Sequence, residues 1–199
     1  NMIIYEIING VGKITLNRAE KYHSFIREMA FQLQDILDKC EKNKEVRSVL
    51  ITAEGKAFCA GQDLLEAIDP DGPDISKILQ EHYNPIIRKI RNMEKPIIAA
   101  VNGLTAGAGV SLALCCDIVV ASEKASFIQA FSKIGLVPDS AGTFFLPRLI
   151  GMQKATALMM TAEPISAIEA EKIGMIYKVY SSKDFVEKSW NLAYKLSNM

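Results

Sequence analysis

The sequence has no surplus of either charge, which argues against one broad class of function. Lysine and arginine together number 23 and aspartate and glutamate also number 23 among the 199 residues, so the formal net charge at pH 7 is zero. Proteins that bind nucleic acid neutralise phosphates with a basic surplus. We therefore expect no nucleic-acid partner, although a small basic patch for one nucleotide-bearing ligand is compatible with this balance.

Metal-binding motifs and membrane-spanning runs are also missing. The four cysteines, at 40, 59, 115 and 116, form no CxxC pair, and the two histidines lie far apart. We expect no metal site and interpret the cysteines as buried thiols of a reducing compartment. The longest apolar stretches are interrupted at residues 102 and 117, too early for a membrane span, and no signal peptide is visible. We expect a soluble, cytoplasmic protein with no membrane partner.

What is present is enough apolar sequence for one sizeable α/β domain, since hydrophobic residues make up 49% of the chain. Apolar periodicity predicts strands over residues 3–8, 12–16, 46–52, 96–101, 117–121 and 175–179. It predicts helices over 27–41, 76–93, 110–116, 140–161 (with a break at Gly151), 166–172 and 183–198. This alternation is typical of an α/β fold with repeated β-β-α turns. We expect a core domain over 1–180 and the start of a C-terminal helical segment over 181–199, whose helix is still running at the last residue.

Two loops place small residues directly after a strand and at the start of a helix. They are residues 57–64 (AFCAGQDL) and 102–109 (NGLTAGAG). A helix N-terminus presents unpaired N–H donors, and glycines let a ligand approach the backbone. Two such N–H groups converging from different loops would make an oxyanion hole, which holds the developing negative oxygen of a reacting carbonyl. Taken singly, each loop fits close packing of a helix on a sheet equally well, and the second fails the GxGxxG dinucleotide pattern.

Three segments in a fixed order make the pairing of these loops specific: KAFCAGQDL, KPIIAAVNGLTAGAGVSLALCCDIVVAS and FSKIGLVPDSAGTFFLPRLIG. Together they resemble the crotonase (enoyl-CoA hydratase/isomerase) superfamily over almost the whole chain. The resemblance implies an α/β crotonase (ClpP-like) spiral of β-β-α turns, with the C-terminal helical segment truncated or absent. It implies a homotrimer or dimer of trimers, an acyl-CoA thioester as ligand and no separate cofactor. It also implies an oxyanion hole made by the backbone N–H groups of Gln62 and Ala108.

The same resemblance identifies the residues that would border the acyl-CoA. By motif position these are Lys21, Tyr22, Ser24, Ala60, Asp63, Leu64, Gly107, Phe131 and Pro138. The stretch that contains Lys21, Tyr22 and Ser24 departs from the family pattern, because Ala19 and His23 replace a proline and an asparagine that are common there. Asp63 has a second interpretation, as a structural cap of the following helix.

The catalytic carboxylate separates the members of this family. Enoyl-CoA hydratases carry one glutamate in the helix after the glycine run and another about one strand later, where this sequence has Ser111 and Phe131. A carboxylate is instead present at Asp139, a position where enoyl-CoA isomerases carry an acidic residue. The segments AFSKIGLVPDSAGTFFLPR, FCAGQDL and HYNPIIRKI resemble in particular the 2-(1,2-epoxy-1,2-dihydrophenyl)acetyl-CoA isomerase subgroup of phenylacetate breakdown. The resemblance implies an isomerase that uses Asp139 as its single acid/base to shift a double bond or rearrange a ring epoxide.

Asp139 also has a structural alternative. An aspartate ahead of Ser-Ala-Gly-Thr is a good N-cap for a helix that begins near Ala141, and spacing alone favours this role. As a base, Asp139 would have its pKa raised by burial among apolar side chains. The side chains expected around it are Phe127, Phe131, Phe144 and Leu146.

Two further functions stay open. One is an enoyl-CoA hydratase with an unusual arrangement of water. The other is a catalytically idle subunit that binds acyl-CoA within an assembly, against which the two intact loops argue. The sequence leaves undecided whether the acyl group is aromatic or a plain fatty chain.

Overall fold

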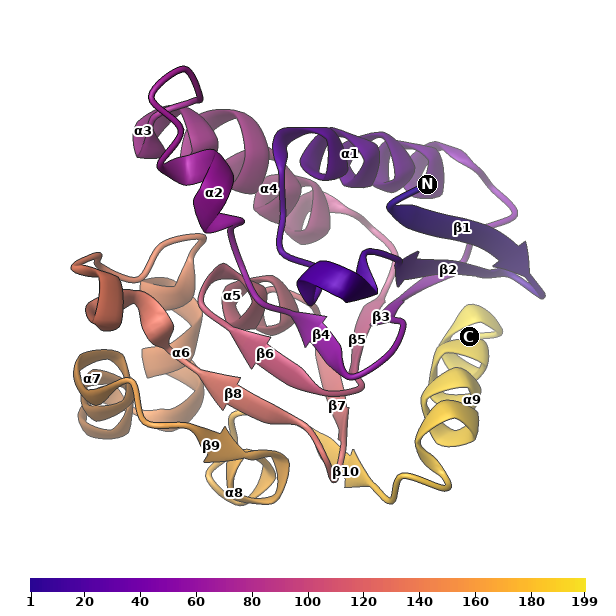
Figure 1. Cartoon of the computed structure of the whole chain (residues 1–199). Helices are drawn as coiled ribbons and strands as arrows, with labels where there is room; N and C mark the ends of the chain where they lie inside the picture. Colours follow the sequence, from indigo (N-terminus) through magenta and orange to yellow (C-terminus); the bar gives the residue numbers. More distant parts are fainter.

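The computed structural model describes residues 1–199 as a large and a small β-sheet with helices packed on them (Figure 1). The large sheet has the strand order β1-β2-β3-β5-β7-β10, and only β1 and β2 are antiparallel. Its strands are β1 Ile3–Ile8, β2 Val11–Leu16, β3 Ser48–Ala53, β5 Ile97–Val101, β7 Ile118–Ser122 and β10 Lys178–Tyr180. The first two predicted strands pair as an antiparallel hairpin, and Asn9 and Gly10 between them have φ angles of 48° and 83°, which suit a two-residue turn.

The small sheet accounts for the β-β-α repeat. Its order is β4-β6-β8-β9, and the strands are β4 Ala57–Cys59, β6 Leu104–Ala106, β8 Ser126–Ile128 and β9 Ile165–Ser166. Along the chain, β4, β6 and β8 each follow a strand of the large sheet and precede a helical segment, so the predicted repeat is confirmed. The short strands themselves were not predicted, because two or three residues give too short a run for apolar alternation.

Except for the short helix α2, which was not predicted, the helices lie close to the predicted ranges, and Gly151 separates α6 from α7 as expected. They are α1 Arg27–Lys42, α2 Leu64–Ala67, α3 Ile75–Ile78, α4 Asn84–Asn92, α5 Ala108–Leu114, α6 Gly142–Ile150, α7 Met152–Thr161, α8 Ala167–Lys172 and α9 Phe185–Ser197. Short 3-10 turns cover Ala19–Lys21 and Ala130–Ile134. No helix is both long and apolar enough to cross a membrane.

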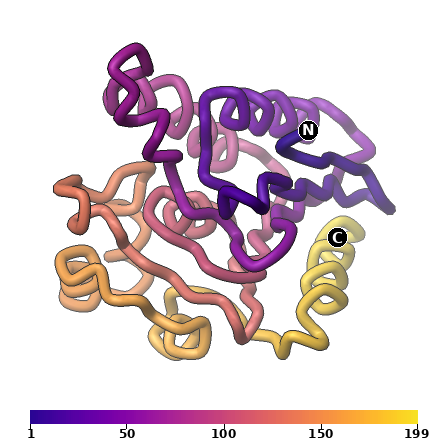
Figure 2. The backbone as a smooth tube through the Cα atoms, viewed as in Figure 1, coloured from indigo at the N-terminus to yellow at the C-terminus, as the bar shows by residue number.

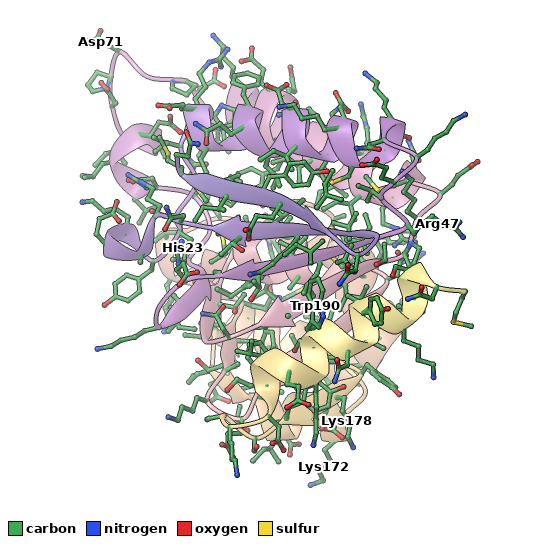
Figure 3. All side chains as sticks on the ribbon, turned by 90° about the vertical axis from the view of Figure 1, so that its right-hand side faces the viewer. His23, Arg47, Asp71, Lys172, Lys178 and Trp190 are labelled. Atoms are coloured by element: carbon green, nitrogen blue, oxygen red, sulfur yellow. The ribbon has the colours of Figure 1, made fainter.

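Helices cover both faces of the large sheet, which explains why β5 is apolar throughout. Ile97, Ala99 and Val101 belong to the core shared with α1, α4 and α5, whereas Ile98 and Ala100 belong to a second core against α9. Figure 3 shows α9 crossing this second face, with Trp190 at the contact. The four cysteines are buried and unpaired, as predicted.

The C-terminal helix ends beside the N-terminal hairpin, although the two are far apart in the sequence (Figure 2). Ser197 Oγ donates to the backbone oxygen of Asn9 at 3.3 Å, and Arg47 donates to the backbone oxygen of Met199 at 3.1 Å. The division into a core over 1–180 and a further segment from 181 stays a prediction.

The helix predicted over residues 76–93 is interrupted by a π-helical turn, Leu79–Tyr83, between α3 and α4. Pro85 has no N–H to donate to the carbonyl of Glu81, and Gln34 Nε2 donates to that carbonyl at 2.8 Å instead. The N–H of Asn84 bonds to the carbonyl of Leu79, five residues back. The strand predicted over 175–179 was placed too early, because the buried Met175 and Ile176 belong to the turn before β10.

Candidate active site

A cavity of about 470 Å³ brings together the segments that the sequence analysis singled out. Its walls come from the loop after β4, the N-terminus of α5, the α2–α4 region and the residues that precede α6. The predicted site residues that line it are Lys21, Ser24, Ala60, Gln62, Asp63, Leu64, Gly107, Ala108, Phe131 and Asp139.

Two predicted residues lie outside this lining. Tyr22 is 54% exposed, and its backbone oxygen accepts a hydrogen bond from the Ala60 N–H at 2.9 Å. Tyr22 therefore supports the loop that follows β4. Pro138 is half-buried directly before Asp139.

The two glycine-containing loops touch each other at the cavity. A Cβ added to Gly61, whose φ is +89°, would lie 3.2 Å from the amide nitrogen of Ala108. A Cβ added to Gly109 would lie only 2.2 Å from the backbone oxygen of Cys59. Gly109 thus serves close packing of α5 on β4, the alternative considered for this loop. That same packing brings the start of α5 next to the loop that carries Gln62.

The backbone N–H groups of Gln62 and Ala108 have no protein acceptor. Ala108 is the first residue of α5, so its N–H has no carbonyl within the helix to bond. The backbone of Phe25 binds the residues on either side of Gln62, accepting from Asp63 N–H at 2.9 Å and donating to Gly61 O at 2.7 Å. Gln62 N–H makes no such bond. Two backbone amides without a protein acceptor therefore belong to residues that line one cavity.

Asp139 does not cap the following helix, so the helix-cap alternative is wrong. The helix α6 begins at Gly142, and no side chain caps its N-terminus. One carboxylate oxygen of Asp139, Oδ1, accepts from the Ser140 hydroxyl at 2.8 Å. Burial raises the pKa of the Asp139 carboxyl, and the hydrogen bond from Ser140 partly opposes that increase. A partly buried carboxylate with a raised pKa is a stronger base than a solvated one.

The backbone after Asp139 is held in an uncommon conformation. Ser140 and Ala141 have φ angles of 53° and 64°, in the left-handed region that costs non-glycine residues of order 1 kcal/mol or more each. Two hydrogen bonds to the Asp139 backbone oxygen stabilise this turn, from Gly142 N–H at 2.8 Å and from Ser111 Oγ at 3.1 Å. The turn leaves the Asp139 side chain on the cavity wall.

The two positions where hydratases carry glutamates are occupied differently. Ser111 is fully buried, and its hydroxyl is engaged by the Asp139 backbone. Phe131 is 5% exposed and lines the cavity. The cavity therefore holds the carboxylate of Asp139, while an aromatic ring and a buried hydroxyl occupy the positions of the two hydratase glutamates.

The apolar surroundings predicted for Asp139 are only partly correct. Phe131 lines the cavity, but Phe144 is 50% exposed on α6, and Phe127 and Leu146 are buried in the core away from the lining. The walls come instead from a segment that the sequence analysis did not connect with the site. Its lining residues are Ile75, Ile78, Leu79 and Tyr83, and Ile134 and Leu136 complete the wall.

Asp63 has the structural role that was its second interpretation. Its Oδ1 caps α2 by accepting from Leu65 N–H at 3.0 Å, and its Oδ2 pairs with Arg18 at 2.8 Å. Burial tends to raise the Asp63 pKa, but the Arg18 guanidinium and the capping bond together lower it. Asp63 thus fixes the loop between β4 and α2 while its side chain borders the cavity.

Comparison with known proteins agrees with this geometry. Residues 6–199 match the family model described as enoyl-CoA hydratase/isomerase, and the chain belongs to this enzyme family. It is 41% identical over 198 residues to the 1,2-epoxyphenylacetyl-CoA isomerase of Escherichia coli K12, covering 98% of this chain and 76% of that relative. It is 38% identical over 180 residues to the trans-2-decenoyl-[acyl-carrier-protein] isomerase of Streptococcus mutans, and the match covers 89% of this chain and 68% of that relative.

Solved structures confirm the predicted crotonase fold. An enoyl-CoA hydratase from Bacillus anthracis superposes with a TM-score of 0.92 at 32% identity, over 100% of this chain and 78% of that chain. An enoyl-CoA hydratase/isomerase from Pseudoalteromonas atlantica T6c gives a TM-score of 0.89 at 32% identity, over 100% of this chain and 77% of that chain.

Proposed function

We propose that this enzyme is an acyl-CoA isomerase in which Asp139 is the single acid/base and the amides of Gln62 and Ala108 form the oxyanion hole. One observation carries the proposal. The only carboxylate that borders the cavity besides the ion-paired Asp63 is Asp139, and no helix N–H occupies it. Its raised pKa suits the removal of a weakly acidic proton.

The mechanism needs no water and no separate cofactor. In a 3-enoyl-CoA, Asp139 removes a proton from the carbon next to the thioester, and the electron pair forms an enolate whose oxygen accepts from both amides. Each such donor is worth about 3 kcal/mol in a comparable site. Asp139 then returns the proton two carbons along, which moves the double bond into conjugation with the thioester. With a ring-epoxide substrate, the same α-proton removal would assist rearrangement of the ring C–O bond.

The acyl-CoA thioester is the ligand that the family and the cavity favour. The polar and small residues at the loop side, Lys21, Ser24, Ala60 and Leu64, are proposed to contact the CoA portion. Gly107, Phe131 and Pro138 are proposed to border the thioester and the acyl group. The apolar walls contributed by the α3 segment and by Phe131 suit a hydrocarbon portion of that group.

We also propose a homotrimer or a dimer of trimers. Large apolar side chains are exposed on three consecutive helices, where contact with another copy would bury them. They are Phe144 and Leu149 on α6, Met152 and Met160 on α7, and Ile168 on α8. Light scattering should give three or six times the 22.0 kDa of one chain, and a monomer at micromolar concentration would contradict the proposal.

The alternative enzyme function is hydration of a 2-enoyl-CoA, which several relatives' names include. Ser111 and Phe131 argue against it, because neither can hold water and exchange its protons as a glutamate pair does. The alternative that is not an enzyme, an idle acyl-CoA-binding subunit, does not account for the two backbone amides without a protein acceptor.

The test compares two reactions in wild type and Asp139→Asn. We expect a double-bond shift on a 3-enoyl-CoA in wild type, lost by at least about 100-fold in the variant, and negligible hydration of a 2-enoyl-CoA in both. Substantial hydration, or isomerisation that survives Asp139→Asn, would refute the mechanism. Tight acyl-CoA binding without either reaction would favour the idle subunit.

A fold control accompanies this test. Because burial raises the folded-state pKa of Asp139, the ionised carboxylate opposes folding once the pH exceeds that pKa. Asp139→Asn should therefore melt no lower than wild type at pH 7, so a lost activity cannot be ascribed to unfolding.

A further inference from the structure

Tyr83 carries a buried phenol hydroxyl that no group of the protein satisfies. The residue is 3% exposed, its Oη has no hydrogen-bond partner, and the residue lines the same cavity as Asp139. Buried tyrosine hydroxyls are nearly always hydrogen-bonded, because an unpaired one loses its bond to water without replacement. A partner from outside the chain is the simplest way to satisfy it.

The location of Tyr83 is fixed by the fold. It ends the π-helical turn between α3 and α4, a type of turn that is frequent at functional sites. The missing N–H of Pro85 and the hydrogen bond from Gln34 to Glu81 hold that turn in place. Its ring packs near that of Phe25, with centroids 6.0 Å apart.

A second residue that lines this cavity, Gln62, also carries a buried polar atom without a partner. Oε1 of Gln62 is buried without a partner, while Nε2 of this side chain donates to Glu66 at 2.7 Å. The neighbouring lining residues Ile78, Leu79 and Leu136 are apolar. A plain hydrocarbon chain placed here would leave both polar atoms unpaired. A ligand oxygen could accept from the Tyr83 hydroxyl, and a ligand hydroxyl could in addition donate to Gln62 Oε1.

We propose that the Tyr83 hydroxyl donates a hydrogen bond to an oxygen atom carried by the acyl group, and that this bond selects oxygen-bearing acyl-CoA thioesters over plain hydrocarbon ones. The inference rests on the proposed function, since it takes the cavity as the acyl site. Burial, with Cys59 and Asp139 nearby, holds the pKa of Tyr83 well above its usual range, so the phenol keeps its proton. An epoxide, ether or hydroxyl oxygen would serve as acceptor.

The test measures binding rather than turnover. Calorimetry compares phenylacetyl-CoA with its 2-, 3- and 4-hydroxyphenyl analogues, on wild type and Tyr83→Phe. In wild type, at least one hydroxylated thioester should bind about tenfold more tightly than phenylacetyl-CoA, and Tyr83→Phe should reduce that preference to about twofold or less. Tyr5→Phe is the matched control, because it also removes a buried phenol hydroxyl, but from β1 outside this cavity, and should leave the preference intact.

A melting curve of the ligand-free variant separates ligand recognition from a structural role. Since the hydroxyl has no partner in the protein, Tyr83→Phe should melt no lower than wild type; a clear decrease would overturn the inference. Equal binding of all four thioesters by wild type, or a preference that survives in Tyr83→Phe, would also overturn it. Absence of binding by all four would overturn the proposed function, and this inference with it.

Discussion

The substitution Gly109→Ala tests whether the close contact between α5 and β4 positions the proposed oxyanion hole. The added Cβ would lie 2.2 Å from the backbone oxygen of Cys59, whereas ordinary contact begins at 3.4 Å. Neither group belongs to a flexible side chain, so α5 and β4 must separate by about 1.2 Å, the difference between these two distances. Ala108 lies on one side of this contact and Gln62 on the other.

The size of the effect follows from hydrogen-bond geometry. An oxyanion-hole donor has to lie about 2.7–3.1 Å from the oxygen that it stabilises, so a shift of 1 Å or more puts one amide out of range. Losing one donor lowers kcat by about 100- to 1,000-fold. Overpacking also lowers the free energy of unfolding by about 1–3 kcal/mol.

The assay is kcat for the 3-enoyl-CoA double-bond shift, measured well below the melting temperature of each variant. Gly103→Ala is the matched control, since its Cβ would lie 2.0 Å from the backbone oxygen of Lys56. It strains the contact between the residues that precede β4 and β6 rather than the contact between β4 and α5. We expect a similar loss of stability in both variants but a much larger loss of kcat in Gly109→Ala. Activity within about fivefold of wild type, or equal losses in the two variants, would refute the reasoning.

Three further predictions concern charge. Ser140→Ala removes a hydrogen bond that lowers the Asp139 pKa, so the acid limb of the plot of kcat/KM against pH should move to higher pH. An acid limb that does not move would mean that a group other than Asp139 titrates. Arg18→Ala leaves the buried Asp63 without its ion-pair partner, the guanidinium at 2.8 Å. Urea titrations should show a free energy of unfolding about 3 kcal/mol lower than that of wild type, and a decrease under about 1 kcal/mol would contradict this. Burial lowers the pKa of His82 below 6.5, so the folded chain binds fewer protons than the unfolded chain, and the free energy of unfolding should fall as the pH drops below about 6.5. This decline should be smaller in His82→Phe, and an unchanged decline would mean that another group causes it.

The glycine loops show how far the sequence could be interpreted without coordinates. Motif order identified both loops and the amides of Gln62 and Ala108, and the structure brings these residues to one cavity. Spacing alone could not separate a ligand-binding glycine from a packing one. That distinction depends on the 2.2 Å between the Cβ position of Gly109 and Cys59, a contact between residues 50 positions apart.

Asp139 shows why local rules were insufficient. Its spacing from α6 favoured a helix cap, but the turn takes left-handed φ angles at Ser140 and Ala141, and the helix starts at Gly142 without a side-chain cap. The buried Ser111, distant in sequence, supports that turn through the Asp139 backbone. Tertiary contact thus overrides a local preference, as is expected at functional sites.

The cavity wall was the largest omission. The apolar face of the predicted 76–93 helix was visible, but nothing in one sequence says which pocket that face borders. The π-helical turn that ends at Tyr83 depends on Pro85 together with Gln34, which lies on α1. Neither the turn nor the orphaned hydroxyl could be predicted from periodicity.

The central claim, that Asp139 takes the α-proton of a thioester held in the oxyanion hole, is tested most directly by proton exchange. An acyl-CoA that has no alkene to isomerise, such as phenylacetyl-CoA, is incubated in D₂O, and NMR follows deuterium entering the carbon next to the thioester. The account predicts exchange with wild type and a rate at least about 100-fold lower with Asp139→Asn. Exchange undiminished in the variant, or absent from wild type that binds the thioester, would contradict it.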